Sequence, residues 1–196
     1  MDVLKILPWI SLASWWGFLG VWIVYWRGNK ENAQQQSRAE SRTYRLFAFA
    51  GVVVMTGILR ELGHPFELPA IPLAPRSLGL MLASNAVSLL GLALAIWARR
   101  TLGRNWSYAV VLKDGHELVT DGPYAAIRHP IYTAILMLFL GLALLIPTPY
   151  AVIGWLLVFW SCWIKLRAEE TLMLRQFPGS YPAYMARTKR LVPGLI

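Results

Sequence analysis

The sequence predicts an all-α, polytopic membrane protein with about five transmembrane helices. Of its 196 residues, 57% are hydrophobic and only 15% are charged, whereas a soluble domain carries about 25% charged residues. Ten Trp, eight Tyr and seven Phe residues add the aromatic side chains that collect where a membrane meets water. Long apolar segments alternate with basic loops, and together these features indicate an integral membrane protein.

Five apolar segments have the length of about 17–25 residues that a helix needs to cross a bilayer. They lie at about 4–26, 45–62, 78–98, 130–146 and 150–166. The first is too long for the apolar region of a signal peptide, and no A-x-A-like cleavage site follows it. Pro147-Thr148-Pro149 separates the last two, and such prolines stop one helix and start the next. We therefore expect these two helices to form a tight antiparallel hairpin.

The polar segments complete the expected organisation. Residues 27–44 are interpreted as a cytosolic linker with room for a short helix, and 63–77, with four prolines, as an extended external loop. Helical spacing continues from about 167 to 189 but is interrupted by Pro178-Gly179. The sequence therefore predicts a cytosolic C-terminal tail made of a helix, a break and a second short helix.

The distribution of basic residues predicts the orientation. Lys and Arg number 19 against 10 Asp and Glu, for a net charge of +9. Sixteen of the 19 fall on one side of a five-span arrangement: between the first and second segments, between the third and fourth, and after the fifth, counting Arg45 and Lys165 at the segment edges. The positive-inside rule then places the N-terminus outside and the C-terminus in the cytosol. We expect this charge to face anionic lipid headgroups rather than nucleic acid, because no basic stripe lies on a soluble domain.

The Cys and His residues do not predict a metal site. The chain has one cysteine, Cys162, which lies in an apolar run and is interpreted as a small packing residue. Its three histidines, at 64, 116 and 129, form no H-E-x-x-H motif, and no C-x-x-C occurs.

Two polar clusters are the candidate functional site. Arg128 and His129 lie at the start of the fourth apolar segment, and Glu169-Glu170 follow the end of the fifth. Because these are the two open ends of one predicted hairpin, residues 40 apart in sequence should be neighbours at the cytosolic face. Ionisable groups at the edge of a bilayer are costly to bury and are usually functional. The simpler alternatives are a charged helix end emerging into water and a histidine that packs at a helix start.

The residues around the carboxylates suggest what the cluster could bind. Lys165 and Glu169 are spaced i, i+4 and share one helix face, and Arg167 lies between them. Carboxylates accept hydrogen bonds from sugar hydroxyls or an amino group, and nearby cations can hold an anionic group. Tyr124 and Tyr132 are candidates for ligand contact, with interfacial aromatic residues as the alternative interpretation.

Three motifs together resemble the isoprenylcysteine carboxyl methyltransferase family, whose relatives include phospholipid and thiol methyltransferases. They are His116-x-Leu118-Val119-Thr120-x-Gly122-Pro123-Tyr124, then Arg128-His129-Pro130-x-Tyr132, then Glu169-Glu170 with Phe177-x-Gly179-x-Tyr181-x-x-Tyr184. Their order and spacing, with the hairpin between them, cover roughly residues 100–194, and the first helices carry no comparable signature. The expected division is therefore three N-terminal transmembrane helices in 1–98 and a catalytic half in 99–196.

The resemblance implies S-adenosylmethionine as methyl donor, bound on the cytosolic side between the hairpin and the C-terminal tail. No G-x-G-x-x-G follows a strand here, as expected for a pocket outside the Rossmann class. The family pattern places cofactor contacts on eight residues, and Glu170, adjacent to the last of them, is a further candidate. The eight are His116, Leu118, Val119, Tyr124, His129, Pro130, Tyr132 and Glu169.

The resemblance also implies an arginine that binds a substrate carboxylate, and its position is occupied by Lys165. We expect Glu169 to orient the cofactor, and Arg128 together with Lys165 or Arg167 to orient the acceptor. The expected function is methyl transfer to a lipophilic or lipidated acceptor, most simply a prenylcysteine-type carboxylate. The alternative acceptors are a phospholipid amine and a small thiol.

A non-enzymatic membrane subunit or a transporter is the alternative of another class. A transporter should show paired discontinuous helices at mid-membrane or an internal repeat, whereas here the polar residues gather at one face. The mid-span polar residues Ser84, Asn85 and Ser88 are interpreted as helix-packing contacts. A nicotinamide-dependent reductase is disfavoured because no phosphate-binding loop is visible.

Overall fold

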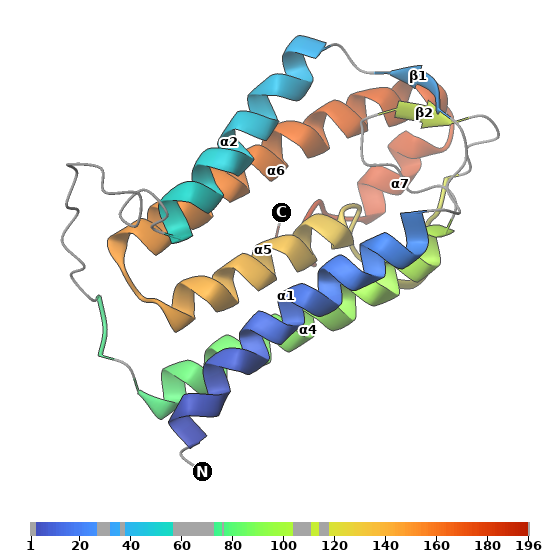
Figure 1. Ribbon diagram of the computed structural model, residues 1–196. Helices are drawn as coiled ribbons and strands as arrows, with labels where there is room; N and C mark the ends of the chain where they lie inside the picture. The colour runs from blue at the N-terminus through green and yellow to red at the C-terminus, as the bar shows by residue number, and fades with distance from the viewer. Residues whose placement is uncertain are drawn as a thin grey trace.

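The computed structural model describes residues 3–26, 32–35, 38–56, 73–75, 77–103, 111–113 and 118–195, and the account below concerns these residues alone. The long helices are α1 (Val3–Trp26), α2 (Arg38–Thr56), α4 (Leu78–Leu102), α5 (Pro130–Leu145) and α6 (Pro149–Gln176). A 3-10 turn, η2 (Gly122–Ala125), precedes α5, and a short helix, α7 (Tyr181–Arg187), follows α6 (Figure 1). The predicted all-α class, the hairpin of the last two long helices and the helix–break–helix tail are confirmed.

The linker prediction was wrong in part. Within 27–44 the structure has a strand, β1 (Asn32–Gln35), and α2 already begins at Arg38. The strand pairs antiparallel with β2 (Val111–Lys113), from the segment between α4 and α5. This backbone pairing joins two loops that are distant in sequence, which a single-segment pattern does not reveal. The predicted external loop falls mostly on residues outside the described part of the chain.

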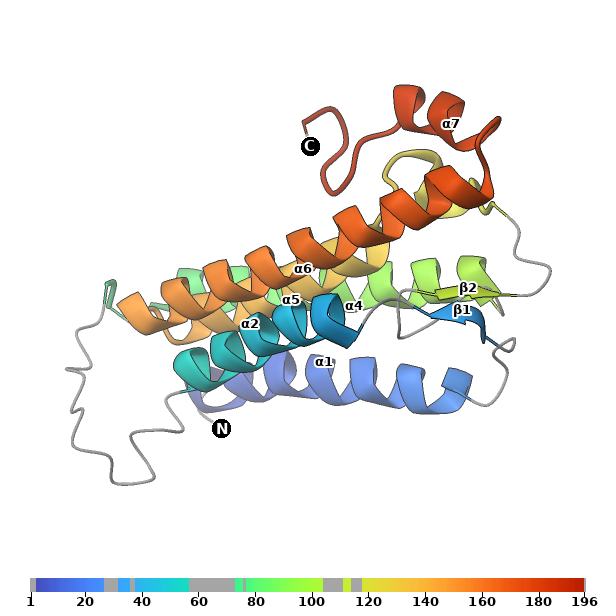
Figure 2. The same cartoon turned by 90° about the horizontal axis from the view of Figure 1, so that it is seen from above.

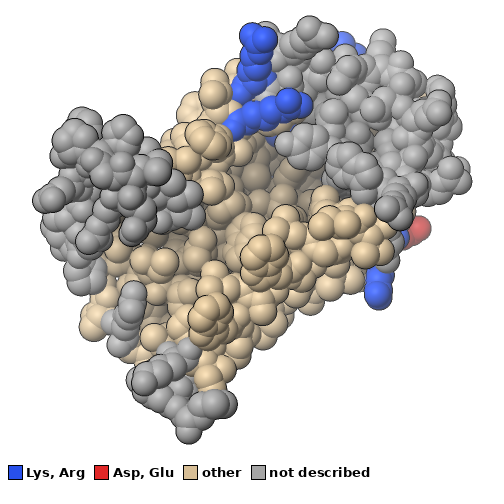
Figure 3. Space-filling view, viewed as in Figure 1, with Lys and Arg blue, Asp and Glu red and all other residues tan. Residues whose placement is uncertain are grey.

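Three of the described helices are long and apolar enough to cross a membrane: Ile6–Val24 within α1, Leu78–Leu102, and Pro149–Gln176. The helix α5, Pro130–Leu145, is apolar but shorter. The protein is therefore an integral membrane protein. The count of five spans stays a prediction. The helix α2 begins with a polar, charged turn, and the predicted second span continues into 57–62, outside the described residues. Figure 3 shows a broad face almost free of Lys, Arg, Asp and Glu, as a lipid-facing surface requires.

Local sequence explains where the helices of the hairpin begin and end. The Thr148 Oγ1 accepts a hydrogen bond from the Ala151 N–H at 3.2 Å and caps α6, with Pro149 in its first turn. Pro130 occupies the corresponding position of α5. Ser77 caps α4 in the same way by accepting from the Leu80 N–H at 3.2 Å. The turn between α5 and α6 is thus confined to residues 146–148.

The helices pack as two neighbouring groups, α1 and α4 against α5, and α2 along α6 (Figures 1 and 2). Buried polar side chains join the first group. The Ser11 Oγ on α1 donates to the Asn85 Oδ1 on α4 at 2.6 Å, and the Ser84 Oγ donates to the Gly141 carbonyl of α5 at 2.7 Å. These contacts confirm the packing interpretation of Ser84 and Asn85, because interhelical hydrogen bonds satisfy polar groups inside a membrane.

The second group depends on two glycines. A Cβ atom at Gly51 of α2 would lie 2.8 Å from the Gly154 carbonyl oxygen of α6, and a Cβ at Gly154 would lie 2.7 Å from the Gly51 carbonyl oxygen. The two backbones therefore approach more closely than any side chain would permit. The consequence is that α2 is held directly against α6, the helix that carries the candidate carboxylates.

The core nearest the candidate site lies between α5, α6 and the C-terminal segment. Its buried members are Tyr132, Leu136, Val158, Cys162, Leu166 and Leu191. Cys162 is a free thiol in this cluster, as its interpretation as a packing residue predicts. Leu191 is only 2% exposed, so it anchors the chain after α7 in this core.

Candidate active site

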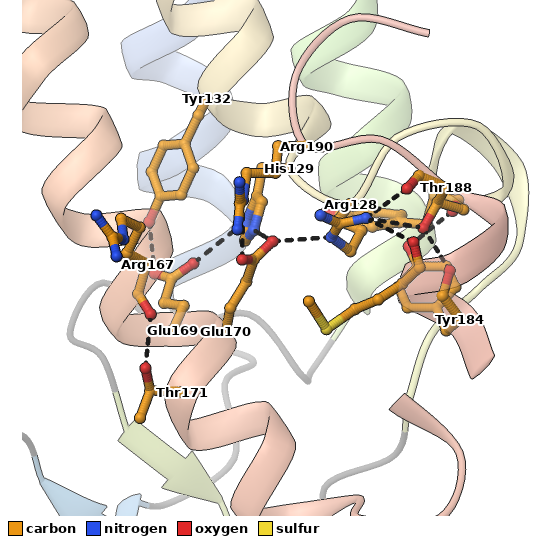
Figure 4. Close-up of polar contacts among 12 residues, drawn as sticks. Arg128, His129, Tyr132, Arg167, Glu169, Glu170, Thr171, Tyr184, Thr188 and Arg190 are labelled. Atoms are coloured by element: carbon orange, nitrogen blue, oxygen red, sulfur yellow. Dashed lines mark hydrogen bonds and ion pairs between the residues drawn. The ribbon is translucent and has the colours of Figure 1, made fainter. Parts of the chain in front are cut away.

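The two predicted polar clusters meet at one end of the helical bundle. Arg128 and His129 precede α5, and Glu169 and Glu170 lie in the last part of α6, so the antiparallel hairpin brings them together (Figure 4). The ends of α1, α4 and α6 and the starts of α2 and α5 lie at this same end, together with the two-stranded sheet (Figure 1). The predicted proximity of residues about 40 apart is confirmed.

Glu170 is a buried carboxylate shared by two arginines. The Arg128 Nε donates to its Oε1 at 2.8 Å, and the Arg190 Nε donates to its Oε2 at 2.9 Å (Figure 4). The side chains of Arg128 and Glu170 are only 7% and 5% exposed. Because both oxygens are bound by guanidinium groups, the negative charge of Glu170 is compensated within the protein.

Arg128 is held on its other side by the chain after α7. Its Nη1 donates to the Thr188 carbonyl at 2.5 Å, to the Met185 carbonyl at 3.2 Å and to the Thr188 Oγ1 at 3.4 Å. The guanidinium is therefore surrounded by acceptors from α6, α7 and the residue that follows α7. Its position is fixed by the protein itself.

Residues 188–191, the C-terminal strap, run beside the segment that leads into α5. The Arg128 N–H donates to the Lys189 carbonyl at 2.7 Å, and the His129 N–H donates to the Arg190 carbonyl at 3.0 Å. The Thr133 Oγ1 donates to the Leu191 carbonyl at 2.7 Å. The strap thus satisfies backbone donors at the start of α5, and it holds the backbone of His129 in place.

Glu169 lies in a more open environment than its neighbour. Its side chain is 24% exposed, and the Tyr132 hydroxyl donates to its Oε1 at 2.5 Å. The His129 Nδ1 lies 3.7 Å from its Oε2, and the His129 Nε2 lies 3.4 Å from the Glu170 Oε1. The adjacent carboxylates therefore differ: Glu170 is enclosed, while Glu169 retains accessible surface for a ligand.

Lys165 lies one turn before Glu169 and points between two aromatic rings. Its Nζ is 5.5 Å from the ring centroid of Tyr44 and 5.6 Å from that of Tyr132. These distances are within the range of cation–π contacts. Tyr44 belongs to α2, so this helix reaches the site as well.

The aromatic residues at the border of the site are buried hydrogen-bonding groups. The Tyr184 hydroxyl of α7 donates to the Tyr124 carbonyl at 2.7 Å. Burial raises the pKa of Tyr184 to about 12, and burial, followed by the nearby Glu169 charge, raises the pKa of Tyr124 well above its usual value. Both phenols therefore stay protonated at neutral pH, and the Tyr184 hydroxyl remains a donor.

Among the remaining predicted site residues, none has a described side-chain contact with this cluster. Pro130 is buried in the first turn of α5, and Leu118 and Val119 are half-buried in the segment before η2. Arg167 is exposed, and among the described contacts its backbone carbonyl accepts from the Thr171 Oγ1 at 3.0 Å. Its guanidinium is absent from the ion pairs of the described residues. His116 lies outside the described residues.

Sequence reasoning missed two residues of this arrangement. Arg190 was visible only as one of several basic residues in the tail, with no signal that it binds Glu170. Tyr44 was not singled out, because a tyrosine near the start of an apolar segment is usual at a membrane interface. Contact with α6 is a tertiary property: the Ser161 Oγ donates to the Tyr44 carbonyl at 2.7 Å.

The fold and this cluster define a helical membrane protein with a buried, charge-compensated site at one end of its bundle. Residues 79–175 match the isoprenylcysteine carboxyl methyltransferase (ICMT) family. This segment, just under half of the chain, contains α5 and almost all of α4 and α6, and over it the chain is similar to that family.

Named relatives are similar over the same part of the chain. A "probable protein-S-isoprenylcysteine O-methyltransferase" of Oryza sativa subsp. indica is 30% identical over 96 residues, covering 47% of this chain and 50% of the relative. "Protein-S-isoprenylcysteine O-methyltransferase B" of Arabidopsis thaliana is 31% identical over 96 residues, covering 47% and 49%. The human protein-S-isoprenylcysteine O-methyltransferase is 31% identical over 97 residues, covering 48% and 34%. The matched part thus spans about half the length of the plant relatives, and less of the human one.

Proposed function

We propose that this protein is an integral membrane methyltransferase that transfers a methyl group from S-adenosylmethionine to a lipophilic acceptor. The acceptor that fits best is a carboxylate of the prenylcysteine type, which the names of the relatives also indicate. The observation that carries the proposal is that two adjacent carboxylates in the segment matched by the family differ in burial. Glu170 is enclosed by arginines, and Glu169 is partly exposed.

The donor set around Glu169 fits S-adenosylmethionine. A partly exposed carboxylate can accept hydrogen bonds from ribose hydroxyls or from the amino group of the methionine part. The buried His129 Nε2 has no hydrogen-bond partner among the described residues, although it lies 3.4 Å from a Glu170 oxygen. Leu118, Val119, Tyr124 and Tyr132 would supply apolar and aromatic surface, and Glu169 would orient the cofactor. S-adenosylmethionine, when bound, supplies a methyl group activated by a sulfonium.

The residues of this chain would then hold and desolvate the acceptor. A carboxylate needs little acid–base help as a nucleophile, so positioning and removal of water are the main requirements. Of the three cations predicted for this role, Arg128 is bound by Glu170 and three acceptors of α7 and the strap, and Arg167 is exposed. Lys165, which lies over two rings and one turn from Glu169, is therefore proposed as the cation that orients the acceptor.

The proposal includes the orientation and the division of the chain. The active site lies at the cytosolic face, with the N-terminus outside and the C-terminus in the cytosol, because most Lys and Arg residues fall on that side. Residues 1–98 would supply helices that support the site, and 99–196 would supply most of its residues. Protease protection of a C-terminal tag in sealed vesicles tests this orientation.

A phospholipid amine or a small thiol is the second candidate acceptor. The observation in its favour is Lys165 at the position where the family resemblance implies an arginine. A lysine presents a compact charge rather than the two-pronged guanidinium that matches a carboxylate. Comparing methyl transfer to a prenylated cysteine, to phosphatidylethanolamine and to a small thiol decides among these acceptors.

The first experiment is calorimetric binding of S-adenosylmethionine and S-adenosylhomocysteine to detergent-purified protein. Glu169→Gln should weaken binding by at least tenfold, since a hydrogen bond to a charged group contributes about 1.5–3 kcal/mol. Asp121→Asn, at an exposed carboxylate, is the matched control and should bind like the wild type. Absence of binding to a well-folded wild type would overturn the proposal in favour of a non-enzymatic or transport role, and normal turnover by Glu169→Gln would remove Glu169 from it.

A further inference from the structure

We propose that Tyr44 of α2 is a positioning residue for the methyl acceptor, acting through the ammonium group of Lys165. The inference rests on the proposed function. It adds to the site a residue from outside the family match at 79–175, in a helix to which the motifs assign no role.

The geometry places the Lys165 ammonium against two ring faces. Its Nζ lies 5.5 Å from the centroid of Tyr44 and 5.6 Å from the centroid of Tyr132. The two tyrosines are 4% and 8% exposed. A cation–π contact is stronger at such a desolvated position than in water, so the two rings favour one location of the ammonium.

Both tyrosines are bound by α6, the helix that carries Lys165: Tyr44 through its backbone and Tyr132 through its hydroxyl. The Ser161 Oγ, one turn before Lys165, donates to the Tyr44 carbonyl at 2.7 Å. The Tyr132 hydroxyl donates to Glu169, one turn after Lys165. The contact of Gly51 with Gly154 holds the rest of α2 against α6. The backbone of Tyr44 is thus held at the level of Lys165.

This arrangement matters because lysine is flexible. Its charge sits on a four-carbon stem with several rotatable bonds, whereas a methyl acceptor must be held in line with the donor within a fraction of an ångström. Two buried rings restrict the stem and favour one point where an anionic acceptor would be bound. Removing one ring leaves the charge in place but lets the ammonium occupy several positions.

The test compares steady-state kinetics of Tyr44→Leu, Tyr44→Phe and the wild type with an S-prenylated cysteine that has a free carboxylate. Tyr44→Leu should raise the acceptor KM about threefold to thirtyfold, the range that one cation–π contact spans between exposed and desolvated positions. The KM for S-adenosylmethionine should change less than twofold. Tyr44→Phe keeps the ring and should restore the acceptor KM. Phe49→Leu, at a 70% exposed position of the same helix, is the matched control.

A double-mutant cycle shows whether Tyr44 acts through Lys165. Lys165→Met removes the charge and should itself weaken acceptor binding. Adding Tyr44→Leu to Lys165→Met should then change the acceptor KM less than twofold, because the cation that the ring holds is gone. An equal effect of Tyr44→Leu in both backgrounds would overturn the inference, as would a wild-type KM for Tyr44→Leu or a failure of Tyr44→Phe to restore it.

A measurement without turnover separates failure of the inference from failure of the proposed function. Acylation of the Lys165 amine by an amine-reactive ester, followed by mass spectrometry, reports how firmly the side chain is held. Tyr44→Leu should raise this rate at least threefold, and Tyr44→Phe should leave it unchanged. If the wild type methylates no acceptor, the proposed function fails and with it the kinetic role of Tyr44, while the acylation rates still decide whether Tyr44 holds Lys165. Equal rates in all three proteins would overturn that contact.

Discussion

The Arg190 Nε lies 2.9 Å from the Glu170 Oε2, and this contact ties the C-terminal strap to α6. The other carboxylate oxygen of Glu170 accepts from the Arg128 Nε at 2.8 Å. One buried carboxylate therefore connects the start of α5, the end of α6 and the strap. The structure in this way separates two glutamates that are adjacent in sequence, since Glu169 faces Tyr132 and remains partly exposed.

Glu170→Gln should destabilise the protein more than Glu169→Gln does. The substitution leaves the buried Arg128 guanidinium without its counter-charge, and breaking a buried pair in this way costs about 3–5 kcal/mol. Thermal unfolding in detergent should show a clear fall in Tm for Glu170→Gln. Asp121→Asn, at an exposed position, should unfold like the wild type. Equal Tm values for Glu170→Gln and the wild type would show that the arginines are compensated in another way.

Leu191→Ala should loosen the strap. Leu191 is 2% exposed in the cluster with Tyr132 and Leu166, and truncation of a buried leucine costs about 2–5 kcal/mol. Because the strap carbonyls accept from the Arg128 and His129 N–H groups, hydrogen exchange at these two amides should accelerate. Leu195→Ala, at a 73% exposed position, is the control. Unchanged exchange at both amides in Leu191→Ala would contradict the strap's role in fixing His129.

Gly154→Ala should disturb the contact of α2 with α6. The new methyl group would lie 2.7 Å from the Gly51 carbonyl oxygen and from the Met55 Cβ, and overpacking of this kind costs about 1–3 kcal/mol. Gly179→Ala is the control, because nothing lies within 4 Å of its would-be Cβ and its φ is not positive. Chemical unfolding in detergent should separate the two variants, and an unaffected Gly154→Ala would mean that the helices move apart at little cost.

The sequence predicted the helices because helix signals are local. Prolines at 130, 147 and 149 and the long apolar runs lie next to the boundaries that they determine. A short turn joins two antiparallel helices, so the predicted hairpin placed Arg128 near Glu170. The pairing of β1 with β2 was missed because it depends on two loops coming together at the end of the bundle.

The environment of each charge could not be predicted in the same way. The sequence shows Glu169 and Glu170 as equivalent neighbours, and only packing shows that Arg190 encloses one of them. Likewise, Arg167 and Lys165 are both basic residues of α6, but they lie on different faces of the helix. Arg167 is exposed, whereas Lys165 points toward Tyr44. Residue type and spacing thus located the site, whereas burial showed which charged side chains are already bound by other residues of the protein.

Tyr184→Phe should remove a pH dependence of stability at alkaline pH. Burial raises the pKa of Tyr184 to about 12 in the folded protein, against a usual value of 10.0, so the unfolded chain loses this proton first as pH rises. The contribution of the Tyr184 hydroxyl is therefore fully present below about pH 10 and is lost between about pH 10 and 12. Below that range Tyr184→Phe should be about 1 kcal/mol less stable, because the hydrogen bond to the Tyr124 carbonyl is gone. Unfolding of both proteins at a series of pH values isolates this residue, since the other titrating groups are common to both. A stability difference that stays constant up to pH 12 would show that the hydroxyl ionises alike in the folded and unfolded chains, and would contradict the raised pKa that burial gives Tyr184.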